Sequence, residues 1–132
     1  MKIYIAGASA EAELCAGYMQ ACRDMGHDIT QDWTVQVRES VICGKRDGDL
    51  TCAERDKAAR EDLEGVRAAD VFWLIVPDGK ASRGCWVELG AAIAWGKSVI
   101  VSGDDGGSIF TELAHFDVKT HEGALERIRD EY

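Results

Sequence analysis

Residues 70–76, DVFWLIV, decide the fold of this chain. The last six are apolar without a break, and Pro77 ends the run. A continuous apolar run of this length, bounded by a turn residue, is typical of a strand buried on both faces of a parallel sheet. Parallel neighbours need helical crossovers between them, so the flanking sequence should alternate strands with helices.

The segments before this run show that alternation. KIYIAG, residues 2–7, is a short β-favouring run that ends in glycine, and apolar residues then recur at helical spacing from Leu14 to Gly26. HDIT, residues 27–30, is a candidate for a second strand. Thr51 opens TCAE, a capping box with Glu54 at the third helical position, which predicts a helix from there to about Ala69.

The segments after the run complete the pattern. An apolar helix is expected from Cys85, followed by the strand SVIVSG at 98–103, a short segment SIFTELAHF at 108–116, and a last amphipathic helix. The order predicts a doubly wound, flavodoxin- or Rossmann-like α/β fold with a parallel sheet of about five strands, in a single domain over residues 1–132. Residues 31–50, which include Trp33, Gly44 and Gly48, are the least regular part and are predicted to form a loop over a site.

Composition restricts the class of partner. Fifteen basic and twenty-four acidic residues give a net charge of −9, which argues against a nucleic-acid polymer or an anionic membrane as partner and leaves room for a small anionic ligand. No apolar run reaches the roughly 18 residues of a membrane span, and the N-terminus turns acidic, so we expect a cytoplasmic protein. Five cysteines form no CxxC and three histidines are scattered, so we expect reduced thiols, no metal and no cofactor.

Three loops should meet at the carboxyl edge of the sheet, where such folds bind ligands: GASAE at 7–11, PDGKASRG at 77–84 and SGDDGGS at 102–108. Glu88 lies in the first turns of the apolar helix that follows the second loop, at the mouth of the fold. Carboxylates in apolar surroundings are rare unless they are paired, hydrogen-bonded or functional. The structural alternative is that Glu88 only interacts with the dipole at the start of its helix.

Asp62 is the second acid of interest, because it shares a helix face with Ala59, Val66 and Ala69. It either faces a site or is a helix acid paired with Arg55 or Arg67. The ASRG turn at 81–84 offers small side chains and backbone N–H groups that suit a phosphate. The sequence contains no dinucleotide fingerprint, no P-loop and no GxSxG elbow.

Taken together, KIYIAG, EDLEGVRAADVFWLIV at 61–76 and SRGCWVELGAAIAWGKSVIV at 82–101 resemble the nucleoside 2-deoxyribosyltransferase family, including its 2′-deoxynucleoside 5′-phosphate N-hydrolase branch. The likeness spans most of the chain and is most specific in the small-residue loop, ELG and GKSVI. It implies that Glu88 attacks the anomeric carbon and forms a covalent glycosyl-enzyme. It also implies that Asp62 protonates or orients the leaving base and that Tyr4 holds the Glu88 carboxylate.

Position 82 bears on the branch. Transferases of the family that act on free nucleosides usually have an acid there, whereas the hydrolases have a serine that contacts the 5′-phosphate. Ser82, with Gly84 also matching, therefore implies hydrolysis of a nucleoside 5′-monophosphate. The first loop departs from the hydrolase pattern, because Ala8 follows Gly7 where serine is expected, and Ser9 or Arg83 is the substitute that we consider.

Two further expectations concern the base and the partner. Trp33 either stacks on a base or is simply packed. The family builds its site from two subunits, with a residue after the fourth strand reaching the neighbour's pocket. Thr111 or Ser108 would match that residue, which implies a homodimer, although DDGGSIFTELAHF at 104–116 departs from the family pattern.

Other functions remain open on the sequence alone. They are deoxyribosyl transfer between free nucleosides, a non-catalytic nucleotide-binding or sensing module, and a TIR-like NAD-cleaving enzyme, which the ELG and GKSVI motifs fit less well. The joint presence of Tyr4, Asp62 and Glu88 favours an enzyme, because a pure binding module has no need of three such groups around one sugar.

Overall fold

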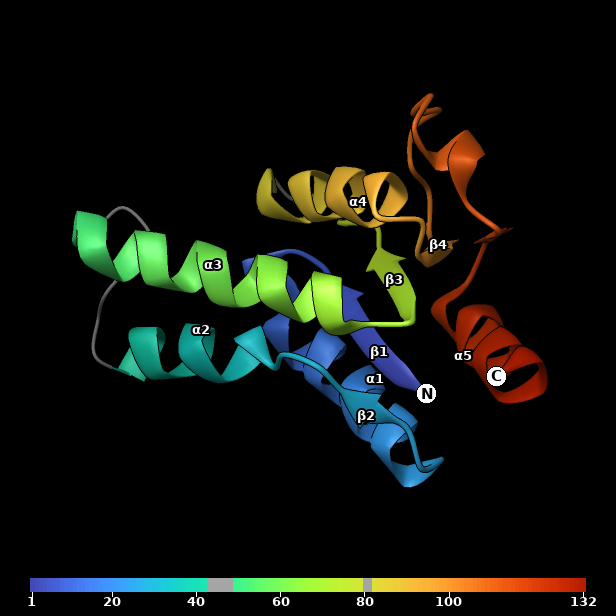
Figure 1. Cartoon of the computed structure of the whole chain (residues 1–132), viewed down its shortest axis with the longest axis horizontal. Coiled ribbons are helices and arrows are strands. Elements are labelled where there is room, and N and C mark those ends of the chain that lie inside the picture. Colours follow the sequence, from blue (N-terminus) through green and yellow to red (C-terminus); the bar gives the residue numbers. More distant parts are fainter. Residues whose placement is uncertain (43–48, 80–81) are drawn as a thin grey trace.

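A five-stranded, all-parallel sheet forms the centre of the computed structural model, which describes residues 1–42, 49–79 and 82–132 (Figure 1). The strand order is β2-β1-β3-β4-β5, with β1 and β3 side by side at the centre. The strands are β1 (Lys2–Ala6), β2 (Asp28–Ile29), β3 (Val71–Ile75), β4 (Ser98–Ser102) and β5 (Phe116–Val118). Every residue of β3 is fully buried, so the predicted central strand and the doubly wound α/β fold are confirmed.

Helices cover both faces of the sheet. Helices α3 and α4 pack against each other and against β1, while α1 and α5 share the other face, where the Tyr18 hydroxyl of α1 donates to Glu122 of α5 at 2.7 Å. The Thr51 hydroxyl accepts the Glu54 N–H at 3.2 Å, so the predicted cap is present. The helices are α1 (Ala12–Asp24), α2 (Trp33–Ile42), α3 (Cys52–Ala68), α4 (Gly84–Ala94) and α5 (His121–Glu131), with 3-10 turns at Ser9–Glu11 and Thr111–Leu113.

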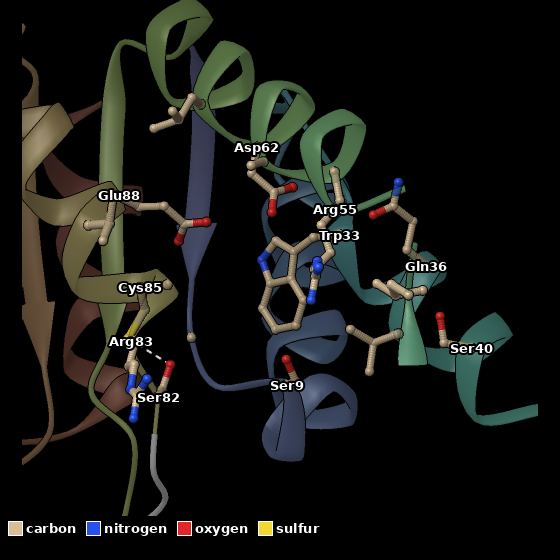
Figure 2. A pocket seen from close by; sticks show the side chains of 18 of the residues that line it. Ser9, Trp33, Gln36, Ser40, Arg55, Asp62, Ser82, Arg83, Cys85 and Glu88 are labelled. Carbon is tan, nitrogen blue, oxygen red and sulfur yellow. Dashed lines mark hydrogen bonds between the residues drawn. The ribbon is translucent and has the colours of Figure 1, made fainter. Parts of the chain in front are cut away.

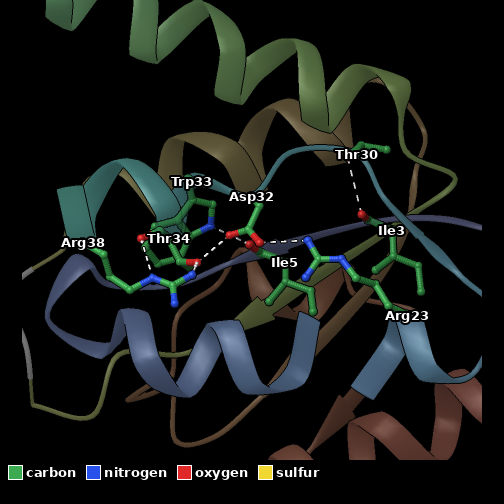
Figure 3. A network of polar contacts seen from close by, with 8 residues as sticks. All are labelled: Ile3, Ile5, Arg23, Thr30, Asp32, Trp33, Thr34 and Arg38. Carbon is green, nitrogen blue, oxygen red and sulfur yellow. Dashed lines mark hydrogen bonds and ion pairs between the residues drawn. The ribbon is translucent and has the colours of Figure 1, made fainter. Parts of the chain in front are cut away.

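Helix α2 corrects the prediction of a loop over residues 31–50. Strand β2 pairs with β1 only as far as Ile3, and no strand among the described residues pairs with the outer edge of β1 beyond that point. The indole N–H of Trp33 donates to the Ile5 carbonyl at 2.8 Å and takes the place of that strand. At the start of α2, Asp32 accepts hydrogen bonds from the Thr34 hydroxyl and, at 2.8 Å, from Arg23 of α1 (Figure 3). These hydrogen bonds join the start of α2 to other elements of the fold, so no periodic pattern in the sequence indicates where the helix begins.

The segment at 108–116, which was predicted as one short element, contains a 3-10 turn and the first residue of a strand. Residues 111–113 form a 3-10 turn, and β5 begins only at Phe116, which pairs with Ile100 of β4.

Within the described residues, no helix combines the length and apolar character that crossing a bilayer requires. Gly44 and Gly48 of the predicted loop, and Lys80 and Ala81 of the loop at 77–84, lie outside the described residues.

Candidate active site

A cavity of about 1210 Å³ lies at the carboxyl edge of the sheet, between the loops after β1 and β3 and the helices α2, α3 and α4 (Figure 2). This is the position at which doubly wound folds bind ligands. Most of the predicted site residues line it, namely Gly7, Ser9, Trp33, Asp62, Ser82, Gly84 and Glu88. Tyr4 lies beneath the cavity floor, and Thr111 is not part of the lining.

Glu88 extends from the second turn of α4 into this cavity. The hydroxyl of Tyr4, from β1, donates to its Oε1 at 2.9 Å. Burial raises the pKa of Glu88 to about 8; the Tyr4 hydrogen bond opposes that rise, and the nearby charge of Asp62 adds to it. The protonated form of this carboxyl is therefore favoured more than that of an exposed glutamate.

Tyr4 is fully buried and is a hydrogen-bond donor over the whole physiological pH range. Burial raises the pKa of its phenol far above the usual value, and the charges of Glu88 and Asp62 raise it further. Its ring lies parallel to that of Phe72 on β3, with 5.9 Å between the ring centroids. The phenol is thus fixed in place before any ligand arrives.

Asp62 faces the same cavity from α3 (Figure 2). Its Oδ1 is buried without a hydrogen-bond partner, and no ion pair among the described residues joins it to Arg55 or Arg67. Burial raises its pKa to about 6, a hydrogen bond from Gln31 lowers it, and the charge of Glu61 raises it. The ion-paired alternative for Asp62 is therefore not what the structure contains.

The two carboxyl groups face the same cavity, and the charge of Asp62 raises the pKa of Glu88. With pKa values of about 8 for Glu88 and about 6 for Asp62, the pair binds close to one proton near neutral pH. One ionised and one protonated carboxyl is the combination that glycosidic cleavage requires, since one group attacks and the other protonates the leaving group.

The loop before α4 forms the entrance side of the cavity. The Ser82 hydroxyl lies 3.2 Å from the buried thiol of Cys85, and the exposed Arg83 extends beside it (Figure 2). Gly84 is the first residue of α4, so free N–H groups at the start of that helix lie next to both side chains. Together they offer a hydroxyl, a cation and backbone donors to an anion.

The first loop packs closely on helix α1 because Gly7 has no side chain. A Cβ at this position would lie 2.5 Å from the Cys15 sulfur. Ala8 is turned inward and buried, whereas Ser9 is exposed and lines the cavity. Of the two first-loop positions, only Ser9 is therefore available to a ligand.

Trp33 and Thr111 are both buried. Trp33 begins α2 and is 7% exposed, so it is packed, yet its ring also forms part of the cavity wall (Figure 2). Thr111 is 1% exposed, and its hydroxyl bonds to Asp105 and, at 2.7 Å, to the Ser108 carbonyl. Neither Thr111 nor Ser108 lines the cavity of its own chain.

Sequence reasoning missed several residues of the site. Gln36 and Ser40 line the cavity from α2, and Arg55 lines it from α3 (Figure 2). The first two were missed because their segment was predicted to be a loop. Gln31, which lowers the pKa of Asp62, was missed because no sequence pattern around it indicates a site.

Two partly buried carboxyl groups facing one cavity at the edge of a doubly wound sheet are the groups that enzymes use to transfer or cleave glycosyl groups. The profile of the nucleoside 2-deoxyribosyltransferase family matches residues 3–123 of the 132. The chain therefore belongs to the nucleoside 2-deoxyribosyltransferase family.

Two solved structures have a similar fold. A 2-deoxyribosyltransferase from Bacillus psychrosaccharolyticus superposes with a TM-score of 0.70 at 23% identity, covering 98% of this chain and 91% of that one. The CMP N-glycosidase BcmB from Clostridium botulinum superposes with a TM-score of 0.63 at 15% identity, covering 100% of both chains. A comparison with curated protein sequences gives no match.

Proposed function

We propose that this enzyme cleaves the N-glycosidic bond of 2′-deoxynucleoside 5′-monophosphates through a covalent glycosyl intermediate on Glu88. The observation that carries the proposal is the group of Tyr4, Glu88 and Asp62 around one cavity, with the Tyr4 hydroxyl 2.9 Å from the Glu88 carboxyl. Membership of the family supports glycosidic chemistry on a nucleoside or nucleotide.

In the first step, the Glu88 carboxylate attacks C1′ of the sugar and forms an ester bond to it. The bond between C1′ and the base nitrogen breaks, and its electron pair goes to the base, which takes a proton from the Asp62 carboxyl. The single proton of the carboxyl pair must lie on Asp62 at this moment. Because the Glu88 pKa lies above that of Asp62, this is the less populated of the two one-proton arrangements, and the Tyr4 hydrogen bond raises its population by stabilising ionised Glu88.

In the second step, water attacks C1′ and displaces the Glu88 carboxylate. Asp62, now ionised, accepts a proton from that water and returns to its starting state. The sugar leaves with a hydroxyl group on C1′, so atoms and charges balance. A second base that replaces the water in this step would give deoxyribosyl transfer instead of hydrolysis.

The 5′-phosphate is assigned to the loop before α4. Ser82, Arg83 and the N–H groups at the start of α4 lie together on one side of the cavity, and Ser9 lies on the loop after β1. Trp33 offers its ring as a wall for the base. The net charge of −9 makes a local anion site necessary, because the protein as a whole repels a phosphate.

We also propose a homodimer with a shared active site. Ile109, Phe110 and Leu113 flank Thr111 and are 76%, 59% and 58% exposed. Apolar side chains exposed together at one place often mark a protein interface. A second subunit covering this segment would bury those side chains and bring the loop of 102–108 close to a neighbouring cavity.

The experiment is a chromatographic screen for base release from the four deoxynucleoside monophosphates and the matching nucleosides, with and without an added acceptor base. We expect release from monophosphates, and we expect Glu88→Gln to abolish it without loss of fold. Ser82→Ala should raise the KM for monophosphates roughly tenfold, the cost of one hydrogen bond to a charged group, and leave nucleosides unaffected.

The other results of this screen are equally informative. Base exchange on free nucleosides would replace the hydrolase assignment with a transferase. Binding of nucleotides without any base release, measured by calorimetry, would identify a non-catalytic module. Full activity in Glu88→Gln would refute the covalent mechanism.

A further inference from the structure

Gly65 lies in the last turn of helix α3, and glycine is a poor helix former. It is buried against the residues that precede α2 and against β1. A Cβ at this position would lie 2.5 Å from the Cβ of Gln31 and 2.9 Å from Cε2 of Tyr4. The backbone of α3 therefore lies directly on these two residues, an approach that only glycine permits.

The atoms beneath Gly65 have little freedom to move. The Cβ of Gln31 is attached to the backbone, and the Tyr4 ring is held by its hydroxyl contact to Glu88 and by the parallel ring of Phe72. The Gly65 carbonyl also accepts a hydrogen bond from the Thr30 hydroxyl at 2.7 Å. A side chain at position 65 would consequently displace the helix and not its neighbours.

Asp62 precedes Gly65 by three residues and so projects from the same face of α3. The depth at which α3 packs at Gly65 thus determines how far the Asp62 carboxyl lies from Tyr4 and Glu88. Gln31, the other residue beneath Gly65, also lies close enough to Asp62 to lower its pKa.

We propose that Gly65 is a positioning residue of the reaction: by allowing α3 to lie directly on Tyr4 and Gln31, it sets the separation of the Asp62 and Glu88 carboxyl groups. This inference rests on the proposed function for its catalytic consequence. Its structural content, the separation of two carboxyl groups, is independent of any substrate.

Gly65→Ala tests the inference, with Gly17→Ala as matched control, because a Cβ at Gly17 in helix α1 has no atom within 4 Å. The groups that act on Glu88 are Tyr4 from β1 and Asp62 from α3, with the thiols of Cys15 and Cys85 nearby. Moving α3 outward weakens the repulsion between the Asp62 charge and ionised Glu88, and it admits water to the cavity. Both changes favour ionised Glu88. Its titration midpoint should therefore move to lower pH.

The primary readout is the 13C NMR titration of the Glu88 carboxyl, assigned by its loss in Glu88→Gln. Kinetics provide the second readout. We expect the midpoint to fall and kcat to fall about tenfold or more in Gly65→Ala, with KM changing less than about threefold, since a small displacement of a catalytic group affects mainly the chemical step. Gly17→Ala should leave the midpoint, kcat and KM at wild-type values.

Thr30→Val provides a second variant that keeps the test decisive if Gly65→Ala does not fold. It removes the hydroxyl that binds the Gly65 carbonyl, and it should shift the midpoint in the same direction by a smaller amount. An unchanged Glu88 midpoint in the folded variants would overturn the role of Gly65. A wild-type protein that releases no base would refute the proposed function alone, because the titration needs no turnover.

Discussion

Replacing Tyr4 with phenylalanine removes one hydrogen bond from the cavity and leaves the buried ring in place. The lost bond is the one at 2.9 Å from the phenol to Oε1 of Glu88. A hydrogen bond to a charged group contributes about 1.5 to 3 kcal/mol. Because this bond stabilises the carboxylate and not the protonated acid, Tyr4→Phe should raise the Glu88 pKa, which is already about 8, by about 1 to 2 units.

The consequence for the rate follows from the proton count of the pair. The reaction needs one proton on the two carboxyl groups, so kcat/KM should be bell-shaped, with limbs near the Asp62 pKa of about 6 and the Glu88 pKa of about 8. In Tyr4→Phe the upper limb should move upward by about 1 to 2 pH units. The plateau should fall roughly 10- to 100-fold, because ionised Glu88 becomes harder to form.

The assay is base release from a deoxynucleoside monophosphate between pH 5 and pH 10, with circular dichroism at each pH. Tyr18→Phe is the matched control, because it removes a comparable hydrogen bond, from the Tyr18 hydroxyl to Glu122 at 2.7 Å, on the opposite face of the sheet. Its profile should equal that of the wild type. A Tyr4→Phe profile with an unmoved upper limb would refute the reasoning, even if the rate were lower.

Two further outcomes can be measured on the folded protein without substrate. The Glu88 pKa lies above its usual value of 4.5, so the folded state binds a proton more tightly than the unfolded state; this contribution to stability is present below about pH 4.5 and is lost as pH rises to about 8. In urea denaturation, the free energy of unfolding of the wild type should fall by a few kcal/mol over this pH range, and that of Glu88→Gln should fall clearly less. An equal fall in both proteins would contradict the raised pKa of Glu88. Phe110→Glu should convert the proposed dimer to a monomer in light scattering, whereas Val35→Glu, at a residue of α2 that is 43% exposed, should not; a wild-type monomer would end the dimer proposal.

The sequence predicted the fold where burial alone determines structure. The run at 71–76 was predicted to be a central strand because six consecutive apolar residues bounded by a proline are typical of a strand buried on both faces, and β3 is fully buried. Glu88 was predicted at the mouth of the fold because its helix follows a strand of a parallel sheet, and the structure has it lining a cavity there. Both inferences used only periodicity and connectivity.

The parts that could not be predicted depend on contacts between distant segments. Helix α2 starts where Trp33 reaches the Ile5 carbonyl and Asp32 binds Arg23, and neither contact leaves a periodic trace. Strand β5 has only three residues, too few for alternation to be visible. From the sequence alone, Gly65 is only a residue that disfavours helix formation. Its close approach to Tyr4 and Gln31 is visible only in the structure.

The place of Trp33 at the edge of β1 has a consequence for protein engineering. Since an indole and not a strand completes that edge, helix α2 forms one wall of the cavity without carrying any of the three groups assigned to the chemistry, which come from β1, α3 and α4. A library at Gln36, Val37 and Ser40 would therefore vary the shape of this cavity wall and leave the two carboxyl groups unchanged. Substrate range and reaction chemistry can be selected separately in this scaffold.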